Sequence, residues 1–321
     1  MKSVTPSPPE SAVLGPSSTS ERQGTALMVA GGLVLGTIGI FVEEARQDPM
    51  TTVFFRCFFG MLALSLWGAA TGRLHELKLR WQELTVALGA GVLIVLNWVL
   101  FFAAIPRVSI AIATVLFHIQ PFFVIGLGAW WLGERVSKAQ VIACVVALAG
   151  LVLATGLIGS KTSLIATSSY QTGVALCLVG AVAYAGLPFI ARKAKRVSSF
   201  ALSWWQSAVG VLLTAWWPLW HGLPQTTTAW LWLAGLGSIH SGIAYVVLYA
   251  GMSQLRTSRV ALLQFVYPLT AIVVDRVVYG HQLTALQTVG VLIMAGALWT
   301  VRRDSKRVCK MPPGAQASTS A

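Results

Sequence analysis

The chain has 321 residues, of which 56% are apolar and only 10% are charged. Soluble domains carry about 25% charged residues and about 45–50% apolar ones, so this composition excludes a soluble globular enzyme and a disordered chain. With only 4 cysteines, and with glycines that show no triplet period, a disulfide framework and a collagen-like fold are excluded too. A polytopic membrane protein remains, and the 13 tryptophans suit its two interfaces.

Long apolar runs predict the fold class. A helix that crosses the hydrocarbon core needs about 20 mostly apolar residues, and these runs are too long for the alternating strands of a barrel. The sequence therefore predicts an all-α membrane protein with ten transmembrane helices. The expected spans are residues 24–44, 50–70, 84–104, 109–132, 139–158, 172–191, 199–220, 230–250, 257–279 and 283–301.

The segments outside the spans are polar. Residues 1–23 are rich in Ser and Pro and are expected to form a disordered tail, and residues 302–321 a basic tail. Residues 159–171 are expected to connect the two halves on the outer side. The start of the chain lacks the basic region and short apolar stretch of a cleavable signal, so the first span is expected to remain as an anchor.

Basic residues predict the orientation. Of the 23 Lys and Arg residues, 18 fall in the tails and in the loops after spans two, four, six and eight, and 3 fall in the other loops. Such an excess marks the cytoplasmic side, so both termini are predicted to be cytoplasmic, with the protein in the plasma or inner cell membrane. The net charge of +13 is then a topology signal, and nucleic acid is not an expected partner.

The chain repeats itself at an offset of 147 residues. Pro121 matches Pro268 in the segments FHIQPFFVIGLGAWWLGERVSKAQ and QFVYPLTAIVVDRVVYGHQLTALQ. Each half, residues 24–158 and 172–301, holds five expected spans. Because five is odd, the second half enters the membrane from the opposite side, which predicts an inverted-topology repeat with a site near the midplane.

The run PRVSIAIATVLFHIQPFFVIGLGAWWLGERVSKAQVIACVVALAG resembles the EamA repeat of the drug/metabolite transporter superfamily. The proline in the fourth span, the LGERVS turn and the following Gln and Gly carry the resemblance, which covers nearly all of residues 24–301. The second copy departs from the pattern, because Gly280 is followed by His281 where the family usually has Gly-Glu. The resemblance implies a ten-helix bundle that moves small metabolites, with a cavity lined by spans three, four, eight and nine.

Polar and amphipathic residues inside the spans are the candidates for a substrate pathway, since they are costly there. His118 lies near the middle of span four and shares a helix face with Thr114, whereas on an ideal helix Gln120 points about 160° away from it. The alternatives are a neutral histidine bonded to a neighbouring helix and polar groups that only join helices. The further candidates are Asn97, Trp98, Tyr245, Gln264 and Tyr267.

Arg56, in the outer third of span two, is the most costly isolated charge. Two interpretations remain open for it. It forms a structural ion pair with Glu43, Glu44 or Asp48 across a short loop, or it contacts a substrate carboxylate.

A second group of residues is expected to be structural. Pro121 and Pro268 each remove a backbone donor and free a carbonyl, which predicts a kink that faces a cavity. Glu134, at the end of span four, is expected to satisfy free backbone N–H groups at a helix end. Gly32 and Gly36 predict close helix packing.

No catalytic or nucleotide-binding motif appears, and no cysteine pair has metal-ligand spacing, so neither a cofactor nor a metal is expected. The candidate lining is amphipathic and mostly uncharged, which suits amino-acid-like solutes better than phosphorylated ones. The sequence thus predicts a secondary transporter, working by alternating access and favouring export. Its expected partners are a small solute and the lipid bilayer, with a homodimer as an option. The alternatives are a membrane-embedded enzyme of lipid or prenyl chemistry and a non-transporting sensor.

Overall fold

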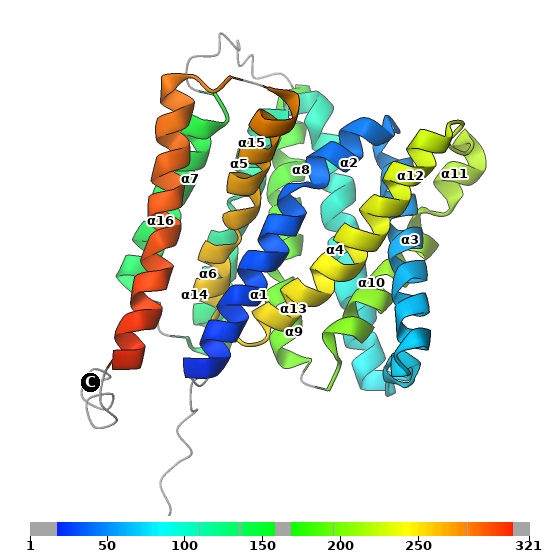
Figure 1. The fold of residues 1–321 in the computed structure, drawn as a ribbon, viewed down its shortest axis with the longest axis horizontal. Helices are drawn as coiled ribbons and strands as arrows, with labels where there is room; N and C mark the ends of the chain where they lie inside the picture. Colours follow the sequence, from blue (N-terminus) through cyan, green and yellow to red (C-terminus); the bar gives the residue numbers. More distant parts are fainter. Residues whose placement is uncertain are drawn as a thin grey trace, which may run out of the picture.

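A computed structural model describes residues 18–108, 110–134, 136–157, 168–194, 196–280 and 282–310. The regular elements of these residues are all helical (Figure 1). Seven helices are long and apolar enough to cross a membrane, and Lys138–Ala154 and Ala285–Trp299 are shorter apolar helices. The all-α membrane class is confirmed for this part of the chain. Residues 199–220, expected as one span, form two short helices outside that group.

The elements of the first half follow one another along the chain as α1 (Ser18–Gly36), α2 (Ile38–Ala45), α3 (Pro49–Ala70), the 3₁₀ helix η1 (Arg73–Leu77), α4 (Trp81–Val108), α5 (Ile110–Phe117), α6 (Gln120–Leu132) and α7 (Lys138–Ala154). Those of the second half are α8 (Ser168–Ala185), α9 (Leu187–Lys193), α10 (Ser199–Thr214), α11 (Trp216–His221), α12 (Thr227–Gly235), the π-helix η2 (Leu236–Ala244), α13 (Tyr245–Met252), α14 (Thr257–Leu263), α15 (Val266–Tyr279) and α16 (Ala285–Lys310).

Helices extend into three segments that were expected outside the spans. Residues 18–23 belong to α1, residues 168–171 to α8 and residues 302–310 to α16. The rest of the expected tails and most of the expected connector lie outside the described residues.

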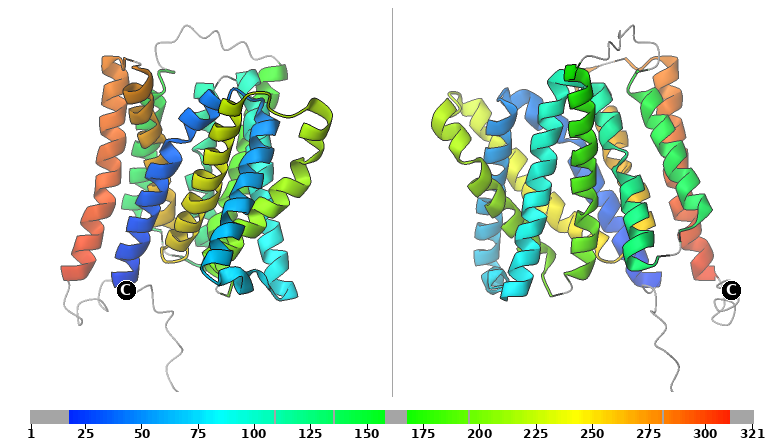
Figure 2. Two further views of the ribbon diagram at one scale, coloured as in Figure 1. Left: turned by 45° about the vertical axis from the view of Figure 1, so that its right-hand side comes forward. Right: turned by 180° about the vertical axis from the view of Figure 1, so that it is seen from behind.

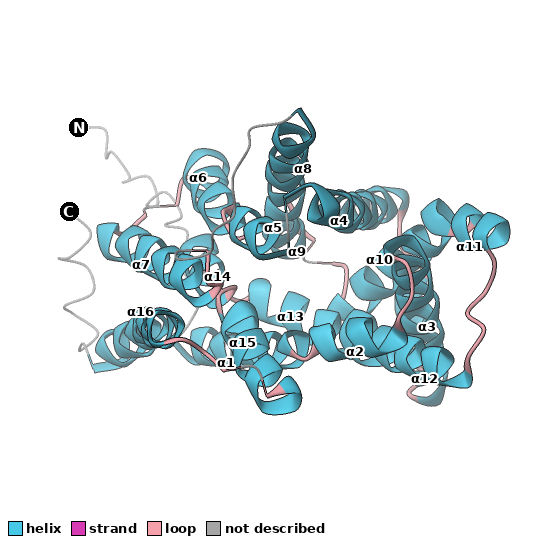
Figure 3. Cartoon of the chain, turned by 90° about the horizontal axis from the view of Figure 1, so that it is seen from above, coloured by secondary structure: helices cyan, strands magenta, loops and turns pink. Residues whose placement is uncertain are grey.

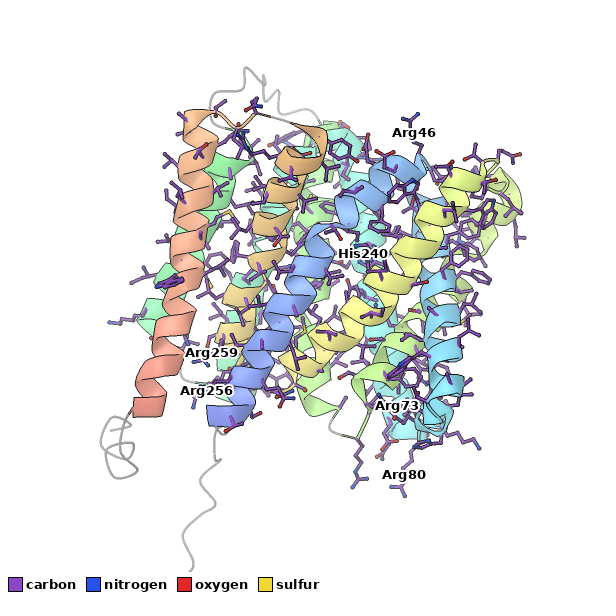
Figure 4. The ribbon with its side chains drawn as sticks, in the orientation of Figure 1. Arg46, Arg73, Arg80, His240, Arg256 and Arg259 are labelled. Atoms are coloured by element: carbon purple, nitrogen blue, oxygen red, sulfur yellow. The ribbon has the colours of Figure 1, made fainter. Side chains whose placement is uncertain are left out.

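The bundle has one basic end. Arg73, Arg80, Arg256 and Arg259 lie at the end where α1 begins and α16 ends, and Arg46 lies at the other (Figures 1 and 4). We call these the basic end and the Arg46 end. The two further views show that α1 begins and α16 ends at the same end of the bundle (Figure 2).

The outer surface is apolar. Trp130, Leu212, Leu219 and Val277 are each more than 75% exposed, and many other large apolar side chains are exposed as well. A protein surrounded by water rarely shows so much contiguous apolar surface, whereas lipid tails are a suitable solvent for it.

The helices pack around a central space. α7 pairs with α16 at one side of the bundle, α4 with α8, and α3 with η2 and α10 (Figure 3). α1 packs against α13 and α15. At Gly32 an added Cβ would lie 2.9 Å from Val266, and at Gly36 it would lie even closer to Thr270. The predicted close packing at these glycines is confirmed.

Two spans are broken near their middle. α5 stops at Phe117 and α6 starts at Gln120, and α14 stops at Leu263 while α15 starts at Val266. Each break precedes a proline by a few residues. Because the ring has no N–H and clashes with the carbonyl four residues back, it interrupts the ladder of backbone hydrogen bonds. The two breaks therefore place polar residues and freed backbone groups inside the bundle.

Candidate functional site

A central cavity of about 270 Å³ lies between α1, α2, α3, α4, α13 and the two broken spans. This volume is near the lower end of the ~300–1,000 Å³ typical of small-molecule sites. Every residue predicted for the substrate pathway lines it, although their roles stay predictions. These residues are Arg56, Asn97, Trp98, His118, Tyr245, Gln264 and Tyr267.

Arg56 is held in one place at the cavity wall. It is 3% exposed, its Nε donates to Ser241 Oγ at 3.0 Å, and its guanidinium carbon lies 3.9 Å from the centroid of the Trp98 ring. No other hydrogen-bond or ion-pair partner of Arg56 occurs in the part of the chain that the structure describes. The guanidinium thus offers its remaining N–H groups to the cavity.

An ion pair between Arg56 and Glu43, Glu44 or Asp48, one of the two interpretations that the sequence leaves open, does not occur among the described residues. Asp48 instead caps α3, where its Oδ1 accepts from the backbone N–H groups of Met50 and Thr51, each at 3.0 Å. Glu44 accepts a hydrogen bond from the Tyr279 hydroxyl at 3.3 Å. Arg56 points inward to Ser241 and Trp98, so it is separated from the carboxylates at the Arg46 end.

His118 occupies the first helix break. Its Nδ1 lies 2.7 Å from the backbone oxygen of Thr114, and its ring stacks on Tyr267 with centroids 5.8 Å apart. A neutral imidazole that donates from Nδ1 carries an acceptor lone pair on Nε2. That Nε2 is buried and has no partner among the described residues. His118 therefore presents a hydrogen-bond acceptor in the cavity wall.

Gln264 occupies the second helix break. It is 7% exposed, and neither its amide oxygen nor its amide nitrogen has a partner in the described part of the chain. A buried amide without hydrogen bonds costs free energy, so this side chain is ready to bind water or a solute. Asn97 differs, because its amide nitrogen donates to the Gly180 carbonyl at 2.9 Å and joins α4 to α8.

Gln120 lines the same cavity as His118. The ideal-helix geometry that places it on the opposite face is wrong, because the helix is interrupted at His118 and Ile119, between α5 and α6. The break turns Gln120 toward the interior, where it is 5% exposed.

Aromatic rings form much of the wall. Trp98 and Tyr245 meet edge to face with centroids 5.9 Å apart, and Tyr184 lines the cavity from α8. Rings of this kind attract cations and pack against apolar groups. The sequence did not single out Tyr184; its position four residues before Pro188, in an otherwise apolar helix, was the available signal.

Ser241 and His240 are further functional candidates; helical spacing places Ser241 on one stripe with Tyr245, whereas the sequence did not single out His240. Both lie in the π-helical segment η2, a form that is rare and frequently found at functional sites. Ser241 orients Arg56, and His240 Nε2 lies 3.0 Å from the Thr37 hydroxyl at the bend between α1 and α2 (Figure 4). A serine beside a histidine in an apolar run was the signal.

Glu134 joins the two halves at the basic end. Its Oε2 accepts from the backbone N–H of Thr257 at 3.0 Å and from the Thr257 hydroxyl. The free N–H that it satisfies therefore belongs to α14, in the second half of the chain. Nearby, Arg259 Nη1 donates to Glu21 Oε2 at 2.8 Å. Pro121 lies in the first turn of α6, and Pro268 lies near the start of α15.

The cavity has a direction. It extends from Leu248 and Leu263 toward Val42 and Ile105, which lie near the ends of α2 and α4 on the Arg46 side. On the basic side, fully buried residues such as Leu255 close the bundle. The space is therefore built toward the Arg46 end.

The chemistry of the site is that of binding. Of the described residues that line the cavity, Arg56 alone is charged. No group of three or more His, Cys, Asp or Glu side chains within the described ranges could hold a metal ion. Cys57, Cys144 and Cys177 are buried free thiols.

The two halves of the sequence each match the EamA-like transporter family, over residues 22–156 and 171–303. The chain belongs to this family. It is 30% identical over 300 residues to "Uncharacterized transporter YxxF" of Bacillus subtilis, covering 91% of this chain and 94% of that protein. It is 28% identical over 225 residues to "Pseudopaline exporter CntI" of Pseudomonas aeruginosa, covering 68% of this chain and 74% of that protein.

One solved crystal structure matches the fold with a TM-score of 0.78 at 18% sequence identity. The match covers 89% of this chain and 99% of that one. The EamA assignment and the multi-pass membrane class thus follow from the family matches and from the apolar helices together. The relatives carry the names of transporters, as expected for a protein that moves solutes.

Proposed function

We propose that this EamA protein is a secondary transporter that exports small amino-acid-like solutes by alternating access. The observation that carries the proposal is the central cavity, whose wall holds one guanidinium and two hydrogen-bonding side chains at the helix breaks. Arg56 binds the carboxylate of the solute, and His118 Nε2 and Gln264 Oε1 accept from its amine. The aromatic wall favours the positive end of a zwitterion.

The solute class follows from the charge of the lining. An N–H donor on a guanidinium forms strong, paired hydrogen bonds to a carboxylate. A doubly charged phosphate needs more than one cation when it is removed from water. Arg56 is the one cation among the described lining residues, so a monocarboxylate with an amine is the better match.

The proposed architecture is ten spans in two inverted five-helix repeats. Helix pairing supports it, because contacts occur in related pairs when each span is exchanged for its counterpart five spans away. The α4 contact with α8 corresponds to that of α13 with α1, and the α3 contact with η2 corresponds to that of α10 with α4. The pairs α7 with α16 and α3 with α10 are their own counterparts. Such repeats commonly build a site near the midplane.

The proposed orientation places the basic end and both termini in the cytoplasm, in the plasma or inner cell membrane. The excess of Lys and Arg at that end supports it. In this orientation the cavity is built toward the outer side. The name of the Pseudomonas relative, a pseudopaline exporter, favours export as the direction.

The test uses purified protein in liposomes loaded with an unlabelled amino acid, with counterflow of the radiolabelled compound as the readout. We expect accumulation that is inhibited by other amino acids, and not by their carboxamides, which lack the carboxylate. Arg56→Gln should reduce counterflow by roughly 10- to 100-fold, the effect of losing a charge-assisted hydrogen bond, while Arg56→Lys should retain part of it.

Arg22→Gln is the matched control, because Arg22 lies near the start of α1 at the basic end and does not line the cavity. Its counterflow should equal that of the wild type. Folding of each variant is checked by size-exclusion chromatography. Transport of a sugar phosphate that amino acids do not inhibit would contradict the solute class. Equal inhibition by an amino acid and its carboxamide would contradict the role of Arg56.

A further inference from the structure

The basic end of the bundle is closed by a contact between the two halves of the chain. Glu134 follows α6, and its carboxylate accepts two hydrogen bonds from Thr257, the first residue of α14. Thr257 is fully buried, and it packs so closely on Gly128 that an added Cβ there would overlap it. This contact joins residues 123 positions apart in the sequence.

A second contact lies beside the first. Arg259 is 8% exposed and donates to Glu21 at 2.8 Å, which ties α14 to the first turn of α1. α14 is thus held to the first half from two directions. Leu255 and Val260, which flank Thr257 in the sequence, have no exposed surface.

The sequence does not provide the same contact at the Arg46 end. At the offset of 147 residues, Glu134 corresponds to His281 and Thr257 corresponds to Ile110. Ile110 has no hydroxyl and His281 has no carboxylate, so these two residues cannot repeat the pair of hydrogen bonds that Glu134 accepts from Thr257. His281 lies outside the described residues. The asymmetry agrees with a cavity built toward the Arg46 end.

We propose that Glu134 and Thr257 form the gate at the basic end, and that the gate must open in each transport cycle. This inference rests on the proposed function. Glu134 holds α14 against α6 while the cavity is open toward the Arg46 end. Releasing both hydrogen bonds from Thr257 frees α14 to separate from α6, which connects the cavity to the basic side. Glu21 and Arg259 add to the closed state without replacing the gate.

The test measures the width of the basic end directly, without transport. Spin labels are attached at Lys138→Cys and Ser253→Cys, two exposed positions on either side of the gate. Cys309 is replaced by Ser, and the three buried cysteines are left. Distances are measured by pulsed electron paramagnetic resonance on protein in nanodiscs. The wild type should give one short, narrow distance distribution. Glu134→Ala should raise the population at longer distances by about 10-fold or more, because charge-assisted hydrogen bonds are lost.

Glu83→Gln is the matched control. Glu83 is an acid at the same end, and its Oε2 accepts from the backbone N–H of Arg80 at 3.0 Å, within the first half of the chain. It should give the wild-type distribution. A wild-type distribution for Glu134→Ala as well would overturn the gate. Lengthening by Glu83→Gln to the same extent would also overturn it, since any loss of negative charge would then suffice.

A second pair of variants keeps the test decisive if Glu134→Ala does not fold. Thr257→Ala removes the hydroxyl donor, while Thr257→Ser retains it. The gate requires longer distances for Thr257→Ala and the wild-type distribution for Thr257→Ser; two equal distributions would overturn it.

The distance change and solute counterflow are separate readouts. Opening by Glu134→Ala in a protein that moves no solute supports the gate and contradicts the transporter proposal. Solute counterflow by the protein, together with no opening by Glu134→Ala, supports the transporter proposal and contradicts the gate.

Discussion

The two broken spans have the same features near their middle and different residues at their ends. Both are interrupted just before a proline, and both end in a glycine with a left-handed conformation, Gly133 with φ 61° and Gly280 with φ 70°. A glycine adopts this conformation at a helix end without the strain of a Cβ. The next residue differs: Glu134 follows the first glycine and crosses to Thr257, whereas His281 follows the second.

The comparison shows which features of the site come from residues that both copies share and which come from residues found in only one copy. The duplicated features, the prolines and the helix breaks, lie beside one cavity in both halves. Arg56, found in one copy, gives the cavity its charge, and in the proposed gate Glu134, also found in one copy, gives it a direction. Arg56 in the first half is matched by Gln206 in the second at an offset of 150 residues. Gln206 accepts a hydrogen bond from Tyr249 and does not line the cavity.

Gly128→Ala is expected to have the largest effect on stability, because it acts on the contact between α6 and α14 that is found at only one end of the bundle. An added Cβ would lie 2.9 Å from the Thr257 Cβ and would overlap its hydroxyl, so α6 and α14 cannot keep their present distance. We expect the variant to lose roughly 1–3 kcal/mol of folding free energy, the usual cost of overpacking. Unfolding by sodium dodecyl sulfate in mixed micelles, followed by tryptophan fluorescence, measures it.

Gly126→Ala is the control on the same helix. Nothing lies within 4 Å of a Cβ added there, so this variant should be as stable as the wild type or gain about 0.5–1 kcal/mol from the better helix former. If both variants lose the same stability, the contact between α6 and α14 has no special importance for the closed end.

The second prediction makes the two helix breaks chemically alike. His118→Gln places an amide in the first break, as Gln264 does in the second. His118 lines the cavity, and its Nε2, which has no partner among the described residues, can accept a proton, so His118 is the candidate proton carrier. We expect an imposed pH gradient to change the wild-type counterflow by roughly 5-fold or more, the lower end of typical couplings between two bound species. The variant should exchange solute and ignore the gradient. A wild-type rate that is independent of the gradient would remove this role from His118.

The sequence predicted much of the fold because lipid imposes a simple rule. An apolar run of sufficient length has to be a helix, since its backbone groups need internal partners. The class and most helix positions followed from that rule. Residues 199–220 were harder, because Ser203, Gln206 and Ser207 point inward and lower the apolar character of the run.

The site was predictable in its residue types and less so in its geometry. Polar side chains inside spans are rare enough to be noticed, and those singled out line one cavity. Their directions depend on irregular backbone, however. Gln120 lines the same cavity as His118 because of a helix break, and Ser241 reaches Arg56 from a π-helical turn. An ideal helix has neither a break nor a π-helical turn, so helical spacing in the sequence does not predict these directions. The partner of Glu134 was also beyond prediction, because it lies on a distant helix.

The smallest effect on stability is expected from breaking an ion pair at the basic end that is not part of the gate. Arg73 and Glu76 both lie in the short helix η1, and Arg73 Nε is 2.5 Å from Glu76 Oε1. The hydrogen bond from Arg73 lowers the pKa of the Glu76 carboxyl below its ordinary value. The stability contributed by the pair is therefore fully present above the ordinary pKa of Glu and is lost as the pH falls through the lowered pKa.

The pair is partly exposed, with 37% of the Arg73 side chain accessible, so water and salt screen it and its contribution is at most about 1 kcal/mol. Glu76→Gln should lower the free energy of unfolding by less than this amount at about pH 7, and the difference should be smaller at about pH 3, which is below the ordinary pKa of Glu. Unfolding in mixed micelles at the two pH values measures it. In the spin-labelled protein, Glu76→Gln should leave the distance across the basic end unchanged, because this pair connects no part of α6 to α14. A difference in stability that persists at low pH would show that Glu76 acts through packing and not through its charge.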